Sequence, residues 1–292
     1  MNAYNHIIKF VPTLENSQEV RSLSKHTVTI KENSSTDFYK DLYTYINFLN
    51  SQGRDILLYS DRTFAPTQKG QLWAFEVKDI VTLFWRSGTL ELEYQKQDNF
   101  TDELLEYWTL HIALPFFFTI EETYDFLHAG AVEIEGKPIL FVAESFGGKS
   151  TMTDFFIKQG HVMISDDKVA CYENDEIFFS VPSIPYHRPY RKMEDLGYFI
   201  ENVAQKPKPI HAIYELDKVE ADAQITISKL QGIEKFKSLR YSSEINLSFL
   251  KNKRFTFLSR LAQVVPVYRV TVPWDMDRLT EVHKAILEHN LS

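Results

Sequence analysis

Hydrophobic and polar residues alternate along much of the first part of the chain, and this alternation is typical of β-strands. Residues 26–31 (HTVTIK) alternate in this way. Further short runs with the apolar, β-branched and aromatic composition of strands follow at 56–60, 72–77, 81–86 and 90–94. The pattern predicts a series of strands up to Tyr94.

Two other stretches in this part of the chain have apolar residues at helical spacing. One is 37–50, for which the spacing predicts a helix. The other is 101–118, where Thr101 and Glu103 form a helix-start signal. Pro115 should bend or end this second helix, because proline lacks a backbone N–H and clashes with the preceding turn.

From residue 128 onward the pattern changes to short buried strands separated by a turn, a glycine-rich loop and a helix. An alternating run and a continuous apolar run flank a Gly-Lys-Pro turn, and a helical stretch closed by Gly160 leads to a further apolar run and two aspartates. In order, the predicted elements are a strand at 131–135, a turn at 136–138, a strand at 139–143, a helix at 149–160 and a strand at 161–165. Late in the chain we expect a helix at 251–260, a strand at 264–273 and a helix at 276–290.

This change of pattern predicts two domains, residues 1–123 and residues 124–292. The first reads as mixed α+β and the second as α/β, so the fold class is α/β (α+β).

Composition narrows the class of protein further. The net charge of −8 argues against a protein that binds nucleic acid or an anionic membrane over its whole surface. The one cysteine, Cys171, cannot form an internal disulfide and suits a reducing compartment.

Neither a secretory signal nor a membrane span is expected. The N-terminal residues are too polar for a signal sequence, and the longest apolar run, 112–120, falls short of the roughly 18 residues that a span needs. We therefore expect a soluble cytoplasmic protein.

The loop after the apolar run at 139–143 has the composition of a phosphate-binding loop. Such a loop needs backbone N–H groups that point inward, a lysine that reaches the phosphates, and a hydroxyl that binds Mg²⁺ at a helix N-terminus. Gly147 and Gly148 provide the permissive backbone, Lys149 the charge and Ser150 the metal ligand. Alanine replaces the usual first glycine, which is acceptable because this position needs only a small side chain. The predicted nucleotide-binding residues are Ala143, Glu144, Ser145, Phe146, Gly147, Gly148, Lys149, Ser150 and Thr151. The alternative is a Gly-Lys-Ser turn that opens an ordinary helix.

The acid pair Asp166-Asp167 closes the strand that follows this helix. A right-handed crossover would place that strand beside the phosphate-loop strand. Consecutive side chains at a strand end point to opposite sides, so one acid could face the metal and the other the acceptor. The alternative is an acidic turn without a chemical role.

Together these residues resemble the HPr serine kinase/phosphorylase family and its shorter relatives, whose fold is like that of phosphoenolpyruvate carboxykinase. The resemblance lies in LHAGAVEIEGKPILFVAESFGGKST (127–151) and QGHVMISDDKVACY (159–172). It implies that the second domain is a kinase domain of this type, that the loop binds ATP, and that the protein self-associates.

The resemblance also implies roles for single residues. Asp166 would act on the acceptor hydroxyl as a base, Asp167 would help Ser150 to hold Mg²⁺, and His128 would lie near the acids and the γ-phosphate. With Lys149, Asp166 and His128 make up the predicted catalytic set. The middle of the loop departs from the family pattern at Phe146 and Gly147, and the longer glycine-rich signature of full HPr kinases is not found after the acid pair. The chain therefore resembles the shorter relatives rather than a true HPr kinase.

A basic segment at 186–197 contains two arginines that could contact phosphate. A guanidinium binds phosphate through two N–H groups, so Arg188 or Arg191 could contact the γ-phosphate or an anionic acceptor. The alternative is a solvated turn before a helix, with the arginines paired to Glu194 and Asp195.

The sequence favours an ATP- and Mg²⁺-dependent kinase that phosphorylates a hydroxyl group. The acceptor would be a serine of a protein or peptide, or a small hydroxylated metabolite. Two alternatives are a nucleotide hydrolase that uses water and a regulatory module that binds nucleotide without turnover. Retention of a candidate base argues against the regulatory module.

Overall fold

The computed structural model describes residues 1–14, 26–35, 40–42, 44–49, 53–66, 68–144, 147–189 and 192–291. The chain forms two compact units. Unit 1 comprises Met1–Thr123 with the short segments Lys192–Leu196 and Leu247–Leu250, and unit 2 comprises Tyr124–Arg191, Gly197–Asn246 and Lys251–Ser292. Strands and helices occur in both units, so the fold is of the mixed α/β class.

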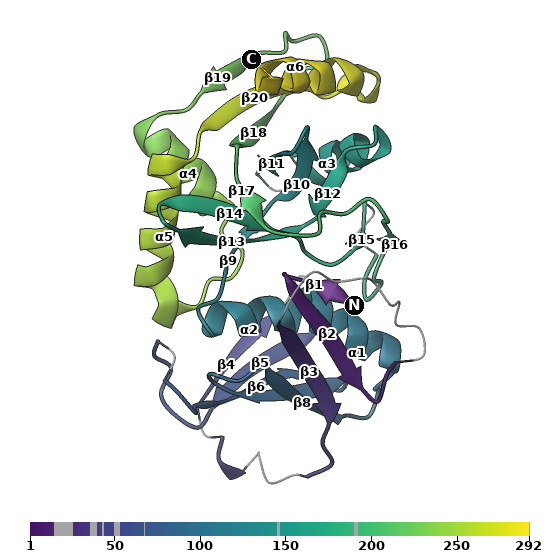
Figure 1. Ribbon diagram of the computed structural model, residues 1–292, viewed down its shortest axis with the longest axis vertical. Helices are drawn as coiled ribbons and strands as arrows, with labels where there is room; N and C mark the ends of the chain where they lie inside the picture. The colour runs from purple at the N-terminus through teal and green to yellow at the C-terminus, as the bar shows by residue number, and fades with distance from the viewer. Residues whose placement is uncertain are drawn as a thin grey trace. The chain divides into compact units, whose positions relative to one another are not determined.

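Unit 1 is built on an eight-stranded sheet (Figure 1). Its order is β1-β2-β3-β8-β7-β6-β5-β4, with β2, β3 and β8 parallel to one another and the remaining neighbours antiparallel. The strands are β1 (Asn2–Ala3), β2 (His6–Val11), β3 (Thr27–Glu32), β4 (Thr44–Leu49), β5 (Asp55–Ser60), β6 (Leu72–Val77), β7 (Val81–Arg86) and β8 (Glu91–Lys96). The strands predicted at 26–31, 56–60, 72–77, 81–86 and 90–94 are confirmed as β3, β5, β6, β7 and β8.

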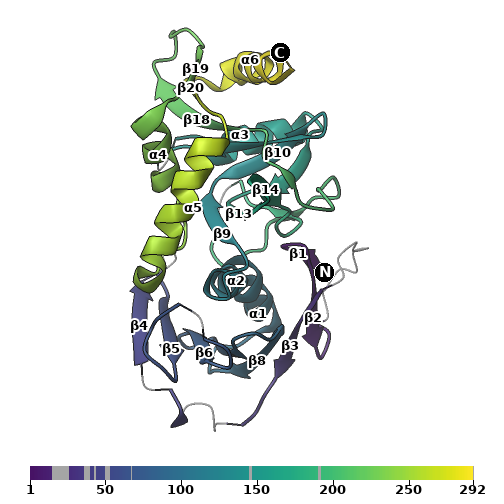
Figure 2. The same cartoon turned by 60° about the vertical axis from the view of Figure 1, so that its left-hand side comes forward.

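A helical layer packs on one face of this sheet (Figure 2). It consists of α1 (Asp102–Trp108), one wider π turn (Thr109–Ala113) and α2 (Leu114–Ile120). The Thr101 hydroxyl accepts a hydrogen bond from the Leu104 N–H and caps α1, as predicted. Pro115 lies in the first turn of α2, where proline is tolerated, so the helical path continues beyond it after the wider turn. Edge-to-face packing of Phe117 on Trp85 contributes to the contact with the sheet.

The helix predicted over 37–50 is wrong for its second half, which forms β4. The sequence of β4, TYINFL, is rich in β-branched and aromatic residues, and pairing with β5 satisfies its backbone groups. Strand composition and a neighbouring strand therefore override the helical spacing. Residues 36–39, 43 and 50 lie outside the described residues.

Unit 2 contains a six-stranded sheet of order β12-β10-β11-β18-β20-β19, a four-stranded sheet of order β17-β14-β13-β9, and the pair β15-β16. The strands are β9 (Asp125–His128), β10 (Gly130–Ile134), β11 (Lys137–Val142), β12 (Val162–Ser165), β13 (Lys168–Asn174), β14 (Ile177–Val181), β15 (Tyr186–His187), β16 (Tyr198–Phe199), β17 (Lys208–Pro209), β18 (Ala212–Val219), β19 (Ile227–Lys229) and β20 (Val267–Pro273). The helices are α3 (Lys149–Lys158), α4 (Gly232–Tyr241), α5 (Lys251–Val264) and α6 (Leu279–Leu291), with a 3₁₀ turn at Met276–Arg278. A further 3₁₀ turn, Ser248–Leu250, belongs to unit 1.

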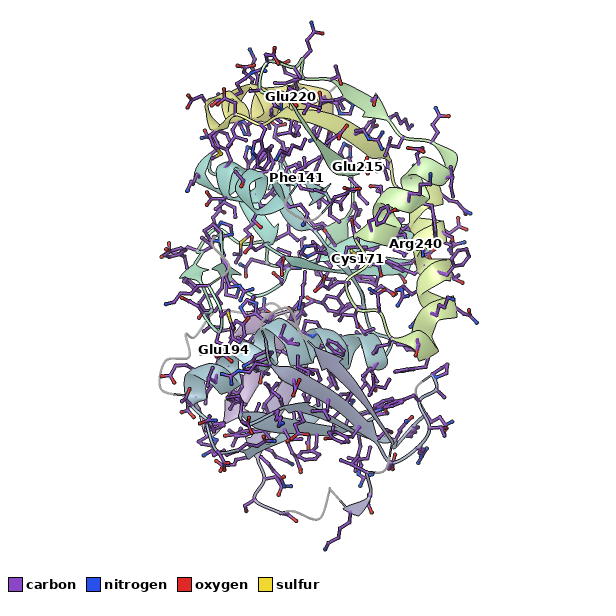
Figure 3. The ribbon with its side chains drawn as sticks, turned by 180° about the vertical axis from the view of Figure 1, so that it is seen from behind. Phe141, Cys171, Glu194, Glu215, Glu220 and Arg240 are labelled. Atoms are coloured by element: carbon purple, nitrogen blue, oxygen red, sulfur yellow. The ribbon has the colours of Figure 1, made fainter. Side chains whose placement is uncertain are left out.

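Alternating residues of the buried strands supply two separate cores, one on each face of the six-stranded sheet. Ile139 and Phe141 of β11 face a core that includes α3 and α6, while Leu140 and Val142 face a core that includes α4, α5 and the four-stranded sheet. Figure 3 labels one member of each core, Phe141 and the buried Cys171. A strand buried on both faces explains the continuous apolar run.

The predicted elements around the glycine-rich loop are confirmed, but one neighbour relation is wrong. The structure has β10, β11, α3 and β12 where the sequence predicts strand, strand, helix and strand, and α5, β20 and α6 where it predicts the late elements. However, β12 pairs with β10 and not with β11. The hairpin partner β10 occupies one side of β11 and β18 the other, so no edge of β11 remains for β12.

Among the described residues, no helix is both long and apolar enough to cross a membrane.

Candidate active site

Four strands of unit 2 end at the same edge of the six-stranded sheet. β10 is antiparallel to both β11 and β12, so β11 and β12 run in the same direction, and β18 and β20 are parallel to β11. The glycine-rich loop follows β11, and the acid pair Asp166-Asp167 follows β12. In open α/β sheets, ligands bind outside the carboxyl ends of the strands. The two predicted site segments therefore share the edge at which a ligand site is expected.

Both described glycines of the loop are required by the backbone, Gly147 by close approach and Gly148 by its positive φ. A β-carbon on Gly147 would lie 2.7 Å from Cβ of Ala143 and 2.9 Å from the Glu144 carbonyl oxygen, closer than real contacts permit. The Gly147 N–H donates to that same carbonyl at 2.9 Å. Gly148 has φ +86° and stands at the N-cap of α3. Ala143 fits because its methyl group lies against a residue without a side chain. Ser145 and Phe146 lie outside the described residues.

The helix that follows the loop begins at Lys149, the first of its ten residues. Lys149 is only 5% exposed. No acidic residue lies in the first turn of α3, so the partial positive charge of the helix N-terminus is not neutralised there. Thr153 packs on Gly130 of β10 so closely that a β-carbon on Gly130 would meet its hydroxyl at 1.8 Å. This contact seats α3 directly on the sheet and fixes the position of Lys149, Ser150 and Thr151 in its first turn.

Asp166 is held by the chain segment that carries His187 and Arg188. The backbone N–H of Arg188 donates to Oδ2 of Asp166 at 2.7 Å, and Nδ1 of His187 lies 2.9 Å from Oδ1. The latter contact has the distance of an ion pair without hydrogen-bond alignment, and among the described residues neither atom has a hydrogen-bond partner. Asp166 is 7% exposed and His187 is 3% exposed. The carboxylate is thus buried with a fixed orientation.

His187 also connects this carboxylate to the helix of the glycine-rich loop. Its Nε2 lies 3.0 Å from Oδ1 of Asp154 in α3. Asp154 and Ser150 are four residues apart and therefore lie on the same face of α3. The imidazole of His187 bridges two carboxylates, one from each predicted site segment. Asp166 is consequently near the helix face that carries the predicted metal ligand Ser150.

Asp167 faces a different set of side chains from Asp166, as expected for consecutive residues at a strand end. Its Oδ1 lies 3.3 Å from Nδ1 of His128, and Oε2 of Glu244 lies 3.5 Å from the same nitrogen. Lys168 also contacts Glu244, at 3.5 Å. The predicted residues His128, Asp166 and Asp167 are thus close together in the structure. Asp167 and His128 are more exposed than Asp166, so a ligand can reach them more easily.

Two neighbouring carboxylates determine the protonation of His187. Burial lowers the pKa of this histidine, but ion pairing with Asp166 and Asp154 outweighs burial, so its pKa is raised above the usual value. A protonated His187 neutralises part of the charge of the two acids. The ion pairs that raise this pKa also stabilise the arrangement that holds Asp166 in place.

The alternative of a solvated turn before a helix is wrong for the basic segment, while the proposed phosphate contact of its arginines stays a prediction. Arg188 is buried, not solvated, and its backbone contacts Asp166. Glu194 accepts two hydrogen bonds from Arg54 within unit 1, and Asp195 lies 3.5 Å from Lys192. No helix follows directly, since the next element is β16. Arg191 lies outside the described residues.

Three side chains of this site were not predicted as site residues: His187, Asp154 and Glu244. His187 follows a serine- and proline-rich stretch among other basic residues, and nothing in the local pattern distinguishes it from them. Asp154 reads as an ordinary polar position of an amphipathic helix. Their one sequence signal is indirect: a buried carboxylate such as Asp166 needs a nearby partner.

We expect the stability provided by His187 to depend on pH. Because its folded-state pKa is raised, its contribution is complete below the unfolded-state pKa, about 6.5, and is lost as pH rises through the folded-state value. Thermal unfolding of wild type and His187→Gln should show a difference in Tm that shrinks as pH rises above about 6.5. His211→Gln is the control, since partial desolvation and the charge of Lys137 lower the pKa of His211, opposite in direction to His187. A His187→Gln difference that is constant with pH would contradict the raised pKa.

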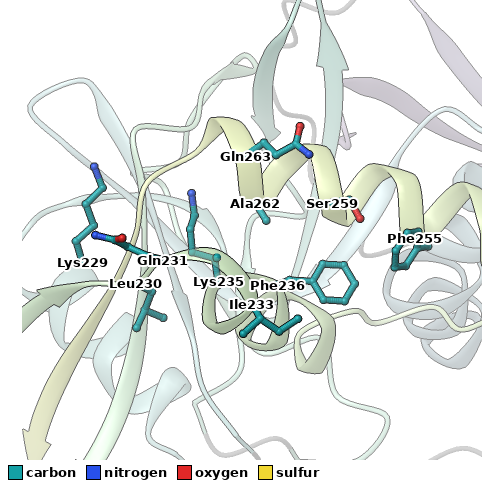
Figure 4. Close-up of a pocket in the computed structure, with 11 residues that line it drawn as sticks. Lys229, Leu230, Gln231, Ile233, Lys235, Phe236, Phe255, Ser259, Ala262 and Gln263 are labelled. Atoms are coloured by element: carbon teal, nitrogen blue, oxygen red, sulfur yellow. The ribbon is translucent and has the colours of Figure 1, made fainter.

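A separate pocket of about 690 Å³ lies between α4 and α5 (Figure 4). Its lining includes Lys229, Lys235, Phe236 and Phe255. None of the candidate site residues lines it, so we assign it no part in the chemistry below.

No family model and no curated protein matches this chain. Among solved structures, the chain is similar to the Hpr(Ser) kinase/phosphatase from Coxiella burnetii. The two sequences are 16% identical, the similarity covers 57% of this chain and 96% of that one, and the TM-score is 0.35. At these values the similarity is distant, and the functional proposal rests on the residues of the site.

Proposed function

We propose that this protein is an ATP- and Mg²⁺-dependent phosphotransferase that transfers the γ-phosphoryl group to a hydroxyl acceptor. The observation that supports this proposal is the shared sheet edge. A glycine loop, Lys149 at the start of α3 and the acid pair after β12 lie there together, and His187 links Asp166 to α3. Phosphoryl transfer needs a phosphate site, a metal ligand and a base close together, and this edge contains residues of each type.

The loop residues fit a nucleotide. Gly148, with φ +86°, has no β-carbon at the N-cap of α3, so a phosphate could approach the backbone of the loop closely at this position. Lys149 would pair with the β- and γ-phosphates, and the N–H groups of the first turn of α3 would donate to phosphate oxygens. Ser150 and Asp167 would hold Mg²⁺. Bound Mg²⁺ would neutralise charge on the phosphates.

In the proposed reaction, Asp166 acts as the base. It takes the proton of the acceptor hydroxyl while the new oxygen–phosphorus bond forms, the bond between the γ-phosphorus and the β,γ-bridging oxygen breaks, and ADP leaves. A carboxylate offers about four lone-pair positions. The contacts with the Arg188 N–H and His187 therefore leave room for an acceptor hydroxyl. These contacts fix the orientation of the carboxylate, which makes His187 a positioning residue. His128, which lies 3.3 Å from Asp167, would be placed near the γ-phosphate.

Arg188→Ala should lower phosphoryl transfer about tenfold while ATP affinity stays within a few-fold. The substitution removes a charged contact with the transferred group, worth about 1.5 kcal/mol, and keeps the backbone N–H that Asp166 accepts. Initial rates and calorimetric titration measure the two effects, with Arg191→Ala tested in parallel and the exposed Arg240→Ala as the control. If neither Arg188→Ala nor Arg191→Ala changes turnover, the segment has no role in transfer.

Release of ADP in the presence and absence of acceptors tests the proposal against its alternatives. Serine-containing peptides and small hydroxylated metabolites are the two acceptor classes to compare. The proposal predicts that one class raises the rate of ADP release above the rate in water. An equal rate without any acceptor would favour a nucleotide hydrolase, and binding of Mg-ATP without ADP release would favour a regulatory module.

A further inference from the structure

An exposed tryptophan stands next to the glycine-rich loop at the sheet edge described above. Trp274 follows β20 directly and is 52% exposed. A β-carbon on Gly148 would lie 3.5 Å from Cζ3 of its ring. The indole therefore lies beside the N-cap residue of α3, where the proposed function places the phosphates.

Two contacts position Trp274, one through its backbone and one through its ring. The backbone N–H of Trp274 donates to the Val219 carbonyl at 3.0 Å, which ties the residue to the end of β18. Nζ of Lys218 lies 3.6 Å from the centroid of the ring, a cation–π contact. An exposed aromatic side chain is thus supported by a cation beside the loop. Lys218 also adds positive charge beside it.

We propose that Trp274 is the platform on which the base of the bound nucleotide stacks, with Lys218 holding the ring. This inference rests on the proposed function and names the part of the site that recognises the base. If the phosphates of a nucleotide lie at Gly148 and Lys149, its sugar and base extend away from the loop. Trp274 is an exposed aromatic surface beside the loop, where such a base could stack. An indole stacks on any nucleobase, because every base has a π-face.

Two consequences follow from stacking on an indole. The first is that adenine and guanine nucleotides should bind with similar affinity, since stacking does not read the hydrogen-bonding edge of the base. The second is that removal of the indole should weaken a nucleotide and leave a ligand without a base unaffected. Mg-tripolyphosphate is such a ligand, as it has the phosphate chain alone.

Calorimetric titration of Mg-ATP and Mg-tripolyphosphate into wild type and Trp274→Ala tests the platform. Base stacking on an aromatic side chain accounts for about 1–3 kcal/mol, so Mg-ATP should bind about 5- to 150-fold more weakly to the variant. Affinity for Mg-tripolyphosphate should change less than about twofold. Trp274→Phe should retain part of the ATP affinity, because a smaller ring still stacks. Tyr241→Ala is the control for loss of an exposed aromatic residue, since Tyr241 is exposed on α4.

The possible failures are distinct. If wild type binds Mg-ATP and Trp274→Ala binds it equally well, the platform is wrong and the proposed function stands. If Trp274→Ala weakens both ligands equally, the ring supports the loop and is not a base platform. If wild type binds neither ligand, the proposed function fails and the platform fails with it.

Discussion

Asp166→Asn should reduce the rate of phosphoryl transfer by a factor of about 10²–10⁴ while Mg-ATP still binds. Asparagine keeps the shape of the side chain, and its carbonyl oxygen can still accept from the Arg188 N–H, but the amide cannot accept the proton of the acceptor hydroxyl. Affinity for Mg-ATP should survive, because one negative charge near the phosphates is removed. Single-turnover rates and calorimetric titration measure the two quantities.

The neighbouring acid supplies the sharpest comparison for this experiment. If Asp167 holds the metal, Asp167→Asn should raise the Mg²⁺ concentration for half-maximal rate, and excess Mg²⁺ should restore part of the activity. Asp175→Asn is the matched control, because Asp175 is exposed in the turn between β13 and β14 and its positive φ suits asparagine. Rescue of Asp166→Asn by Mg²⁺, with Asp167→Asn inactive but able to bind ATP, would reverse the two roles. Full activity of both variants would place the catalytic carboxylate elsewhere.

Lys149→Ala should weaken Mg-ATP binding at least about tenfold and slow transfer by a further factor on the order of 10². The ammonium group would contact the β- and γ-phosphates, and a charge-assisted contact of this kind contributes about 1.5–3 kcal/mol. The loss should be larger in the rate than in binding, because charge on the phosphates is redistributed in the transition state. Calorimetric titration and initial rates measure both effects.

The control for Lys149 is Lys284→Ala, which removes an exposed lysine from another helix of the same unit. It should leave binding and rate unchanged. Affinity of Lys149→Ala for Mg-ATP equal to that of wild type would contradict the assignment of 143–151 as a phosphate-binding loop. Loss of the folded state, seen as a lower Tm, would show instead that the buried lysine supports the helix start.

The local parts of the fold could be predicted from the sequence because each carries its own signal. The continuous apolar run of β11, the glycines of the loop and the closing Gly160 of α3 specify strand, loop and helix within about 25 residues. β4 could not be predicted, since aromatic residues at helical spacing also suit a strand once β5 pairs with it. The neighbour of β12 depends on strand pairing, which is decided by the whole sheet and not by local pattern.

The same division applies to the candidate site. The glycine loop and the acid pair are each a contiguous segment of the sequence, so the chemistry of each could be predicted from its residue types. The contacts of His187 with Asp154 and Asp166 join residues 33 and 21 positions apart, and they form only when β15 returns to the edge of the sheet. Trp274 follows a strand that lies more than 100 residues after the loop. Contacts between side chains that are distant in sequence follow no fixed spacing, so they could not be predicted from the sequence.

The fate of the γ-phosphoryl group tests the central claim most directly. Phosphorus NMR of Mg-ATP incubated with wild type and the two acceptor classes distinguishes a phosphate ester from free phosphate. The account predicts a new phosphate ester that forms together with ADP, and that neither Lys149→Ala nor Asp166→Asn produces at a comparable rate. Formation of inorganic phosphate alone, or no change in ATP while it remains bound to the protein, would contradict the assignment as a phosphotransferase with a hydroxyl acceptor.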